Sequence, residues 1–327
     1  MHRFIIAVFS TLILLVAMTP VAQAISFTFQ TIDPPGPFFT IIPFGINDSG
    51  TISGAFTDAA LRDHGFLFDG TIFTTFDHPS ADATKVFALR GTDASGLNNA
   101  GQIVGSYTQG GVLHGFVRGS TGTFTPLDVP GHLHTGLTGI NDLGAIAGEY
   151  NDTGSVNTFH SFLRDSGGTF TLFDVPGATT TQVDGLNNAS QSVGVYNTQG
   201  GTNPFRGFLR ASGGVFTLLD VPGASETVPV GINDGGTIVG DFTDAAGTTH
   251  AFLRDSGGTI TPFDVPGATF TAATEINNRG EIVGQFCDAS DVCHGFLATP
   301  VPEPGSLALL AAGLWLLIVK RPRHREP

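Results

Sequence analysis

Short apolar segments recur along the chain between clusters of glycine, proline, asparagine and aspartate. They are rich in β-branched and aromatic residues, as in Ile103–Tyr107, Phe170–Pro176 and Ile238–Phe242. Short runs of this composition, bounded by turn residues, are typical of β-strands rather than helices. The pattern therefore predicts an all-β domain.

A tripeptide of the Gly-Ile-Asn type repeats six times, at 45–47, 96–98, 139–141, 185–187, 231–233 and 275–277. It belongs to the first of four predicted strands in each unit. The third strand begins with His64, His114, His160, His250 or His294, and with Arg206 in the fourth unit. Repeats of this length with four strands each favour propeller blades over short solenoid turns.

The segments between the predicted strands have the composition of tight turns. Asn141–Gly144 and Asn233–Gly236 separate strands one and two, and Asp165–Gly168 separates strands three and four. Val175–Ala178 and Val265–Ala268 place Pro and Gly at the centre of a predicted type II turn that leads to the next unit.

The two ends of the repeat array are offset by one strand. The chain after residue 24 begins with a lone fourth strand at 27–34, and the last unit has strands one to three without a fourth. A ring would let the N-terminal strand complete the last sheet and protect both edges. We therefore expect a six-bladed β-propeller with four-stranded blades, and an open stack of the same units is the alternative.

Composition narrows the class of protein further. The 327 residues include 45 Gly and 19 Pro, which disfavours a helical bundle, and 41% are hydrophobic, which disfavours disorder. The formal net charge is −14, and Lys85 is the single lysine between residues 25 and 300. No basic surface for nucleic acid is expected. The acidic surface that this charge implies should accept divalent cations or neutral sugars more readily than acidic polymers.

The first 24 residues form a predicted signal peptide. His2 and Arg3 precede an apolar run at 4–18, and Ala22-Gln23-Ala24 supplies the small-x-small cleavage pattern. Cleavage is expected between Ala24 and Ile25. An uncleaved N-terminal anchor is the alternative.

The C-terminal segment, 300–327, has three successive parts. A motif of Val301, Pro302, Glu303, Pro304 and Gly305 precedes an apolar predicted transmembrane helix at 306–319 and a basic tail at 320–327. The apolar run is shorter than the ~20 residues of an ordinary span, and its basic end should remain cytoplasmic.

These three parts, in this order, resemble the PEP-CTERM sorting signal of exopolysaccharide-producing Gram-negative bacteria. The resemblance implies processing by an exosortase, a membrane protease-transpeptidase. It also implies transient inner-membrane anchoring, followed by transfer to the cell surface or extracellular matrix. A plain C-terminal anchor is the alternative.

Residues 25–299 resemble the HAF repeats of extracellular proteins. His250-Ala251-Phe252 matches the His-Ala-Phe core, and 64–66, 114–116 and 294–296 are near matches, whereas Arg206 departs from it. The resemblance implies an exported protein but no settled activity, and no site residue can be carried over from it.

Repeated polar residues are more consistent with structure than with catalysis. The repeated histidines could act as metal ligands, but equivalent positions in a ring lie far apart, and Arg206 replaces histidine in the fourth unit. His132-x-His134 lacks a third ligand nearby, and the Asn-Asp-x-Gly turns lack the alternating carboxylates of calcium loops. Asp128, Asp174, Asp220 and Asp264 recur too regularly for a single catalytic role. No catalytic, metal-binding or cofactor-binding residue, and no cofactor, is therefore predicted.

Cys287 and Cys293 flank the predicted turn between strands two and three of the last unit. An exported protein meets oxidising conditions, so we expect a disulfide that staples this hairpin, with two free thiols as the alternative.

Three functions remain open at the level of sequence. The first is a non-catalytic surface or matrix protein that contacts exopolysaccharide or other surface proteins. The second is a secreted carbohydrate-active enzyme, a glycoside hydrolase or lyase, which an asymmetric carboxylate cluster at one mouth of the ring would favour. The longer first unit, with Lys85 and Arg90, is the one sign of asymmetry and is expected to be an irregular surface loop. A soluble ligand-binding module is the third.

Overall fold

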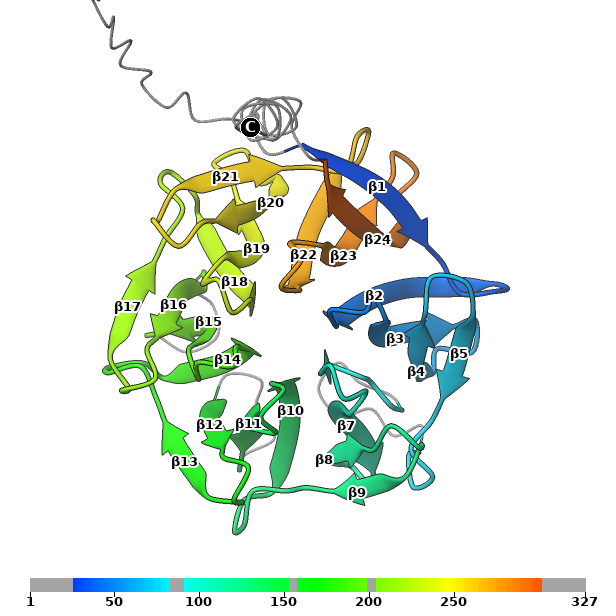
Figure 1. Ribbon diagram of the computed structural model, residues 1–327, viewed down its shortest axis with the longest axis vertical. Helices are drawn as coiled ribbons and strands as arrows, with labels where there is room; N and C mark the ends of the chain where they lie inside the picture. Colours follow the sequence, from blue (N-terminus) through cyan, green and yellow to red (C-terminus); the bar gives the residue numbers. More distant parts are fainter. Residues whose placement is uncertain (1–25, 83–90, 153–157, 199–203, 302–327) are drawn as a thin grey trace, which may run out of the picture.

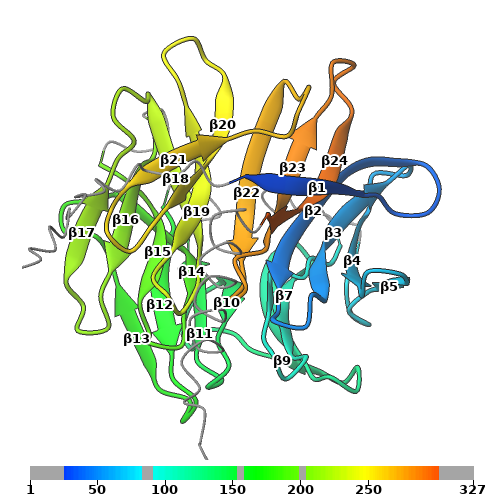
Figure 2. The ribbon, with the colours of Figure 1, turned by 45° about the horizontal axis from the view of Figure 1, so that its top comes forward.

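The computed structural model describes residues 26–82, 91–152, 158–198 and 204–301. All regular elements in these ranges are strands, and they form six four-stranded antiparallel sheets around a common axis (Figures 1 and 2). The predicted six-bladed propeller is confirmed. The predicted signal peptide and the predicted apolar helix of the tail lie outside the described residues.

Blades one to three follow the chain. Blade one contains β2 (Phe38–Ile46), β3 (Ile52–Asp58), β4 (Asp63–Phe68) and β5 (Phe73–Phe76). Blade two contains β6 (Gly96–Leu97), β7 (Ile103–Gln109), β8 (Val112–Arg118) and β9 (Phe124–Pro126). Blade three contains β10 (His134–Ile140), β11 (Ile146–Asn151), β12 (His160–Arg164) and β13 (Phe170–Phe173).

Blades four to six complete the ring. Blade four contains β14 (Thr180–Leu186), β15 (Ser192–Asn197), β16 (Arg206–Arg210) and β17 (Phe216–Leu219). Blade five contains β18 (Glu226–Ile232), β19 (Ile238–Thr243), β20 (Thr249–Arg254) and β21 (Ile260–Phe263). Blade six contains β22 (Phe270–Ile276), β23 (Ile282–Cys287), β24 (Cys293–Pro300) and β1 (Phe27–Ile32).

The N-terminal strand closes the ring as predicted. β1 pairs antiparallel with β24, from Phe27 opposite Pro300 to Ile32 opposite Gly295, and Figure 1 shows the two strands side by side. The Val301 N–H donates to the Ser26 carbonyl at 2.9 Å. The propeller therefore begins and ends at the same place on blade six.

Each blade has the same core. A fully buried phenylalanine stands on the third strand of every blade: Phe66, Phe116, Phe162, Phe208, Phe252 and Phe296. In blade three its ring lies against Gly148 of the second strand. A Cβ added to Gly148 would lie 2.6 Å from the Phe162 ring and 2.4 Å from the Gly136 carbonyl oxygen. The Gly on strand two and the Phe on strand three are thus complementary parts of one packing unit.

Turns alternate between the two faces of the disc because successive strands are antiparallel. We call the face with the turns between strands one and two, and three and four, the rosette face. The opposite face carries the turns between strands two and three and the connections between blades, and we call it the loop face.

Candidate functional site

The centre of the rosette face is a closed ring of alternating aspartates and asparagines, which we call the rosette. Each blade supplies the residue after its repeated asparagine: Asp48, Asn99, Asp142, Asn188, Asp234 and Asn278. Each asparagine Nδ2 donates to the Oδ2 atoms of both flanking aspartates, at 2.8–3.1 Å. Each backbone N–H donates to the side chain of the next member, at 2.7–2.9 Å.

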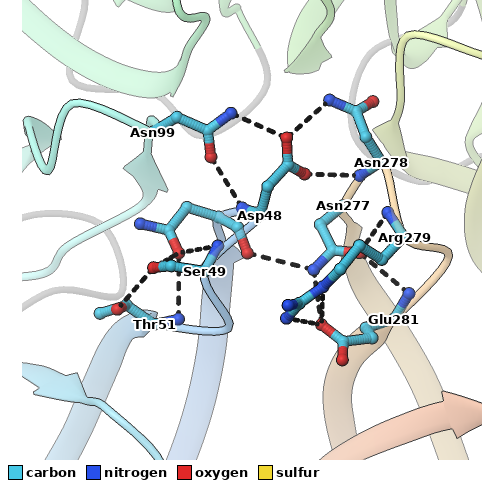
Figure 3. A network of polar contacts seen from close by, with 9 residues as sticks. Asp48, Ser49, Thr51, Asn99, Asn277, Asn278, Arg279 and Glu281 are labelled. Carbon is cyan, nitrogen blue, oxygen red and sulfur yellow. Dashed lines mark hydrogen bonds and ion pairs between the residues drawn. The ribbon is translucent and has the colours of Figure 1, made fainter.

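A second ring lies below the first. Its members are the repeated asparagines Asn47, Asn98, Asn141, Asn187, Asn233 and Asn277. Each Nδ2 donates to the carbonyl of the equivalent residue in the next blade, at 3.0–3.5 Å. Figure 3 shows Asn277 reaching the turn of blade one below the contacts of Asp48 with Asn99 and Asn278.

The alternation of aspartate and asparagine in the rosette matches hydrogen-bond acceptors with donors. An aspartate carboxylate only accepts hydrogen bonds, and an asparagine Nδ2 has two hydrogens to give. The donors from Asn278 and Asn99 and the nearby Arg279 lower the pKa of Asp48, against the effect of its burial. The two rings enclose a cavity of about 70 Å³, which has room for a few waters but not for a sugar.

Metal binding finds no support in the part of the chain that the structure describes. No group of three or more His, Cys, Asp and Glu side chains is placed to hold an ion there. His132 Nδ1 lies 3.0 Å from Asp152, and His134 Nδ1 accepts the Leu113 N–H at 3.1 Å. The two histidines of the His-x-His pair thus have separate polar partners.

The repeated histidines of the loop face pair with aspartates. The Nδ1 atoms of His114, His160 and His250 lie 2.8–2.9 Å from the aspartates fourteen residues later. His64 pairs with Asp77, and His294 pairs with Asp33, which the N-terminal strand supplies. In blade four Arg206 makes the equivalent contact with Asp220 at 3.1 Å.

An aromatic ring of the second strand lies beside each histidine. The five pairs are Phe56–His64, Tyr107–His114, Tyr150–His160, Phe242–His250 and Phe286–His294, with ring centroids 5.3–5.4 Å apart. The predicted structural role of the histidines is consistent with these contacts, but their aspartate partners were not predicted. The spacing of fourteen residues in blades two to five, and of thirteen in blade one, was the available signal.

Half-buried carboxylates, Asp93, Glu149, Asp184 and Asp241, form an asymmetric group in blades two to five that sequence reasoning missed. Burial raises the pKa of Asp93 to about 6 and those of Glu149 and Asp241 to about 7. The pKa of Asp184 is also well above its ordinary range, because of burial and then the charges of Glu149 and Asp241. Glu149 accepts from Gln182 Nε2 at 2.9 Å.

Glu275 is a further half-buried acid, at the position that is glycine in the other five repeats. It lies close to Gly231, where an added Cβ would be 2.7 Å from its Oε1. Burial raises its pKa to about 8, although the Ile276 N–H donates to Oε1 at 2.9 Å. Carboxyl groups with pKa values near neutrality can exchange protons at physiological pH.

The predicted disulfide is present. Cys287 and Cys293 are opposite each other in the hairpin of β23 and β24, with an S–S distance of 2.00 Å. It lies on the loop face of blade six.

Most residues of the predicted processing sites lie outside the described residues. Of the predicted sorting motif, Val301 follows β24, and the others, Pro302, Glu303, Pro304 and Gly305, are not described. The same holds for Ala24 and Ile25 at the predicted cleavage site. No helix in the described part is long and apolar enough to span a membrane.

Comparison with known families identifies the tail. Residues 300–323 match the PEP-CTERM protein-sorting motif. The chain therefore carries the sorting signal of an exported protein that is directed through the membrane to the cell surface, and this signal is consistent with processing by an exosortase.

Comparison with solved structures supports the fold alone. A mutant of AofleA from Arthrobotrys oligospora is similar at a TM-score of 0.52 and 11% identity, over 87% of this chain and 92% of that one. The Aleuria aurantia lectin in complex with Fucα1-6GlcNAc is similar at 0.50 and 12%, over 82% and 98%. A gluconolactonase from Xanthomonas campestris is similar at 0.48 and 14%, over 84% and 90%. No curated protein sequence matches the chain.

Proposed function

We propose that this protein is a non-catalytic binding platform at the surface or in the extracellular matrix of a Gram-negative bacterium. In this proposal an exosortase processes its tail, and the propeller contacts exopolysaccharide or other surface proteins. We include in this proposal that the repeats are of the HAF type and that the signal peptide is cleaved after Ala24.

The repetition on the loop face is the observation that carries the proposal. Six blades present a partly exposed pair of a basic side chain and an aspartate, five with histidine and one with Arg206. A catalytic centre is normally a single asymmetric arrangement, whereas equivalent surfaces around a ring suit several weak contacts with one repetitive polymer. Such contacts gain strength from high effective concentration.

The sorting step can be tested in the native host. Cells with the wild-type protein are fractionated beside cells with a Pro302-Glu303-Pro304→Ala version, and the mature C-terminus is determined by mass spectrometry. We expect the wild type to lose its tail and reach the outer surface while the variant stays intact in the inner membrane. If both retain residues 305–327 in the same fraction, the tail is a plain anchor and exosortase processing is wrong.

The binding role needs a separate measurement. Exported protein is incubated with exopolysaccharide from its host, and co-sedimentation and release of reducing ends are both followed. Retention without cleavage is the expected result. No retention of the wild type would refute the binding role, and steady release of sugar would replace it with catalysis.

The carbohydrate-active enzyme remains a second candidate because of the half-buried carboxylates with raised pKa values. Glycoside hydrolases use paired carboxyl groups, one of them with a raised pKa as proton donor. Glu149, with a pKa of about 7, and the neighbouring Asp184 have these properties. If polysaccharide is cleaved, Glu149→Gln should abolish cleavage and leave retention of the polymer unchanged.

A further inference from the structure

Four adjacent blades have an arginine at the end of the third strand, and two of these arginines, Arg118 and Arg210, have a buried Nε without a hydrogen-bond partner among the described residues. Arg210 is 9% exposed and stacks on Phe173 of the preceding blade, with 4.5 Å from its guanidinium carbon to the ring centroid. Its Nε has no hydrogen-bond partner, and it forms no ion pair within the described residues. A buried polar group left in this state is costly and calls for an explanation.

A cavity of about 310 Å³ lies beside Arg210 at the seam between blades three and four. We call it the seam cavity; it is on the rosette face but outside the rosette. Arg164 also lines it and, like Arg210, forms no ion pair in the described part of the chain. The nonpolar part of the lining comes from Ala145, Leu163 and Leu186.

Ser190 lines the same cavity and breaks the repeat. The other five turns have glycine at this position, always with positive φ, namely Gly50, Gly101, Gly144, Gly236 and Gly280. Ser190 adopts φ of 58° although it has a side chain, a conformation that is unfavourable for residues other than glycine. The cavity lining therefore includes a serine where the other turns have glycine, and Ser212 is a second serine in the same lining.

The polar lining is suited to an anion. Two guanidinium groups face one carboxylate, that of Asp165, whose Oδ1 already accepts the Thr169 N–H at 2.8 Å. The seam cavity therefore has an excess of positive charge on a chain of net charge −14. The sequence-based expectation that acidic sugars are disfavoured describes the average surface and not this location.

We propose that the seam cavity binds a hexuronic acid residue of an anionic polysaccharide, with its carboxylate held by Arg164 and Arg210 and its ring against the nonpolar lining. Planar guanidinium groups match carboxylates in bidentate geometry. The volume is at the small end of the about 300–1,000 Å³ typical of ligand sites, as suits a single sugar ring. This inference rests on the proposed binding function and adds to the loop-face contacts a separate site for one sugar residue on the rosette face.

The test uses the exported protein and glucuronate, with glucose and inorganic phosphate as comparison ligands, in titration calorimetry at low salt. Glucuronate should bind and glucose should not. Arg210→Gln should weaken glucuronate binding by at least about tenfold, as expected for a lost charge-assisted hydrogen bond. The matched control is Arg118→Gln, since Arg118 also stacks on a phenylalanine and has an unpaired Nε, but belongs to blade two.

Ser190→Gly distinguishes a binding role from a structural one. It restores the residue of the other five turns and relieves the positive φ, so the melting temperature should rise while glucuronate binding weakens. This variant, with Arg164→Gln, decides the matter if Arg210→Gln fails to fold.

Several results would overturn the proposal. These are no glucuronate binding, glucuronate binding unchanged in Ser190→Gly and Arg164→Gln, or phosphate binding as tight as glucuronate binding. Failure here is distinguishable from failure of the proposed function. If the wild type retains host polysaccharide and does not bind glucuronate, the uronate site alone is wrong.

Discussion

The two faces of the propeller use the same repeat in different ways. At the centre of the rosette face, the turn between strands one and two of every blade contains an asparagine followed by an aspartate or a second asparagine. These side chains form hydrogen bonds with the neighbouring blades in two closed rings. On the loop face the repeated His–Asp pairs are contacts within one blade, and they leave the side chains partly exposed.

The difference indicates where variation is tolerated. A member of the rosette must satisfy two neighbours at once, so a change in one blade disturbs three. A loop-face pair can change alone, as Arg206 and Asp220 show in blade four. We infer that the rosette specifies closure of the ring, while the loop face is free to be adapted for binding.

Asn141→Ala should have the largest effect. The side chain is 4% exposed, and its Oδ1 accepts the N–H groups of Leu143 and Ala145 while its Nδ2 donates to the Asn187 carbonyl. Three polar groups, one of them buried and two partly buried, lose their partner, so we expect a loss of about 3 kcal/mol in urea unfolding. Leu143→Ala, at a 65% exposed position of the same turn, should change stability by less than about 0.5 kcal/mol.

The outcome of this pair tests the comparison directly. If Asn141→Ala and Leu143→Ala are equally mild, the rosette face has no special role in holding the ring together.

The half-buried carboxylates with raised pKa values predict a loss of stability with rising pH. A carboxyl whose pKa is raised by folding binds its proton more tightly in the folded chain. Its contribution is therefore complete below the unfolded pKa of about 4 and falls as the pH rises through the folded value. For Glu149, with a pKa of about 7 in the fold, the fall between pH 5 and pH 8 should be about 2–3 kcal/mol.

Unfolding in urea at pH 5 and pH 8 measures this fall. Glu149→Gln should reduce it, because the amide does not titrate and its oxygen can still accept from Gln182. Asp255→Asn is the control, because the Thr259 N–H lowers the pKa of Asp255 and that group stays ionised across this range. A pH dependence that is the same in wild type and Glu149→Gln would show that Glu149 is not held protonated.

The architecture was predictable because it depends on local patterns. Tight turns, a Gly-Ile-Asn every 43 to 51 residues and the one-strand offset of the ends each appear in consecutive residues. Together they indicated six blades and the strand that closes them. The disulfide followed from two cysteines on one hairpin.

The polar sites were not predictable, because they join residues from different repeats. Asp48 and Asn278 are 230 positions apart and meet only when the ring closes. Their alternation is visible in the sequence, but there the residues suggested turns only. Alternation of two residue types around a closed ring requires an even number of blades, so this pattern could have supported the prediction of six.

The half-buried acids had less local signal. Glu149 and Asp241 share one repeat position, directly after the glycine of the second strand, whereas Asp184 stands on an inner strand. The interaction between these acids depends on packing between blades. Ser190 is unusual only by comparison of the aligned turns, and Arg210 shares its repeat position with three other arginines.

The disulfide of blade six extends the comparison to a covalent bond on the loop face. Cys293→Ser opens a loop with a sequence separation of 6, so the expected loss is about 2 kcal/mol in thermal unfolding without reductant. With dithiothreitol present, wild type and variant should melt together. A larger loss in the variant would mean that this hairpin supports the closure formed by β1 and β24.

His160→Ala should have the smallest effect. Its side chain is 40% exposed, and its contact with Asp174 is an exposed ion pair at 2.9 Å, a class of interaction that contributes about 0–1 kcal/mol. Thermal unfolding of His160→Ala beside His160→Arg, which copies blade four, measures the freedom of this face. Both variants should stay within about 1 kcal/mol of wild type. A loss approaching that of Asn141→Ala would show that the pairs hold the blades together, and repetition on the loop face would then no longer argue for binding.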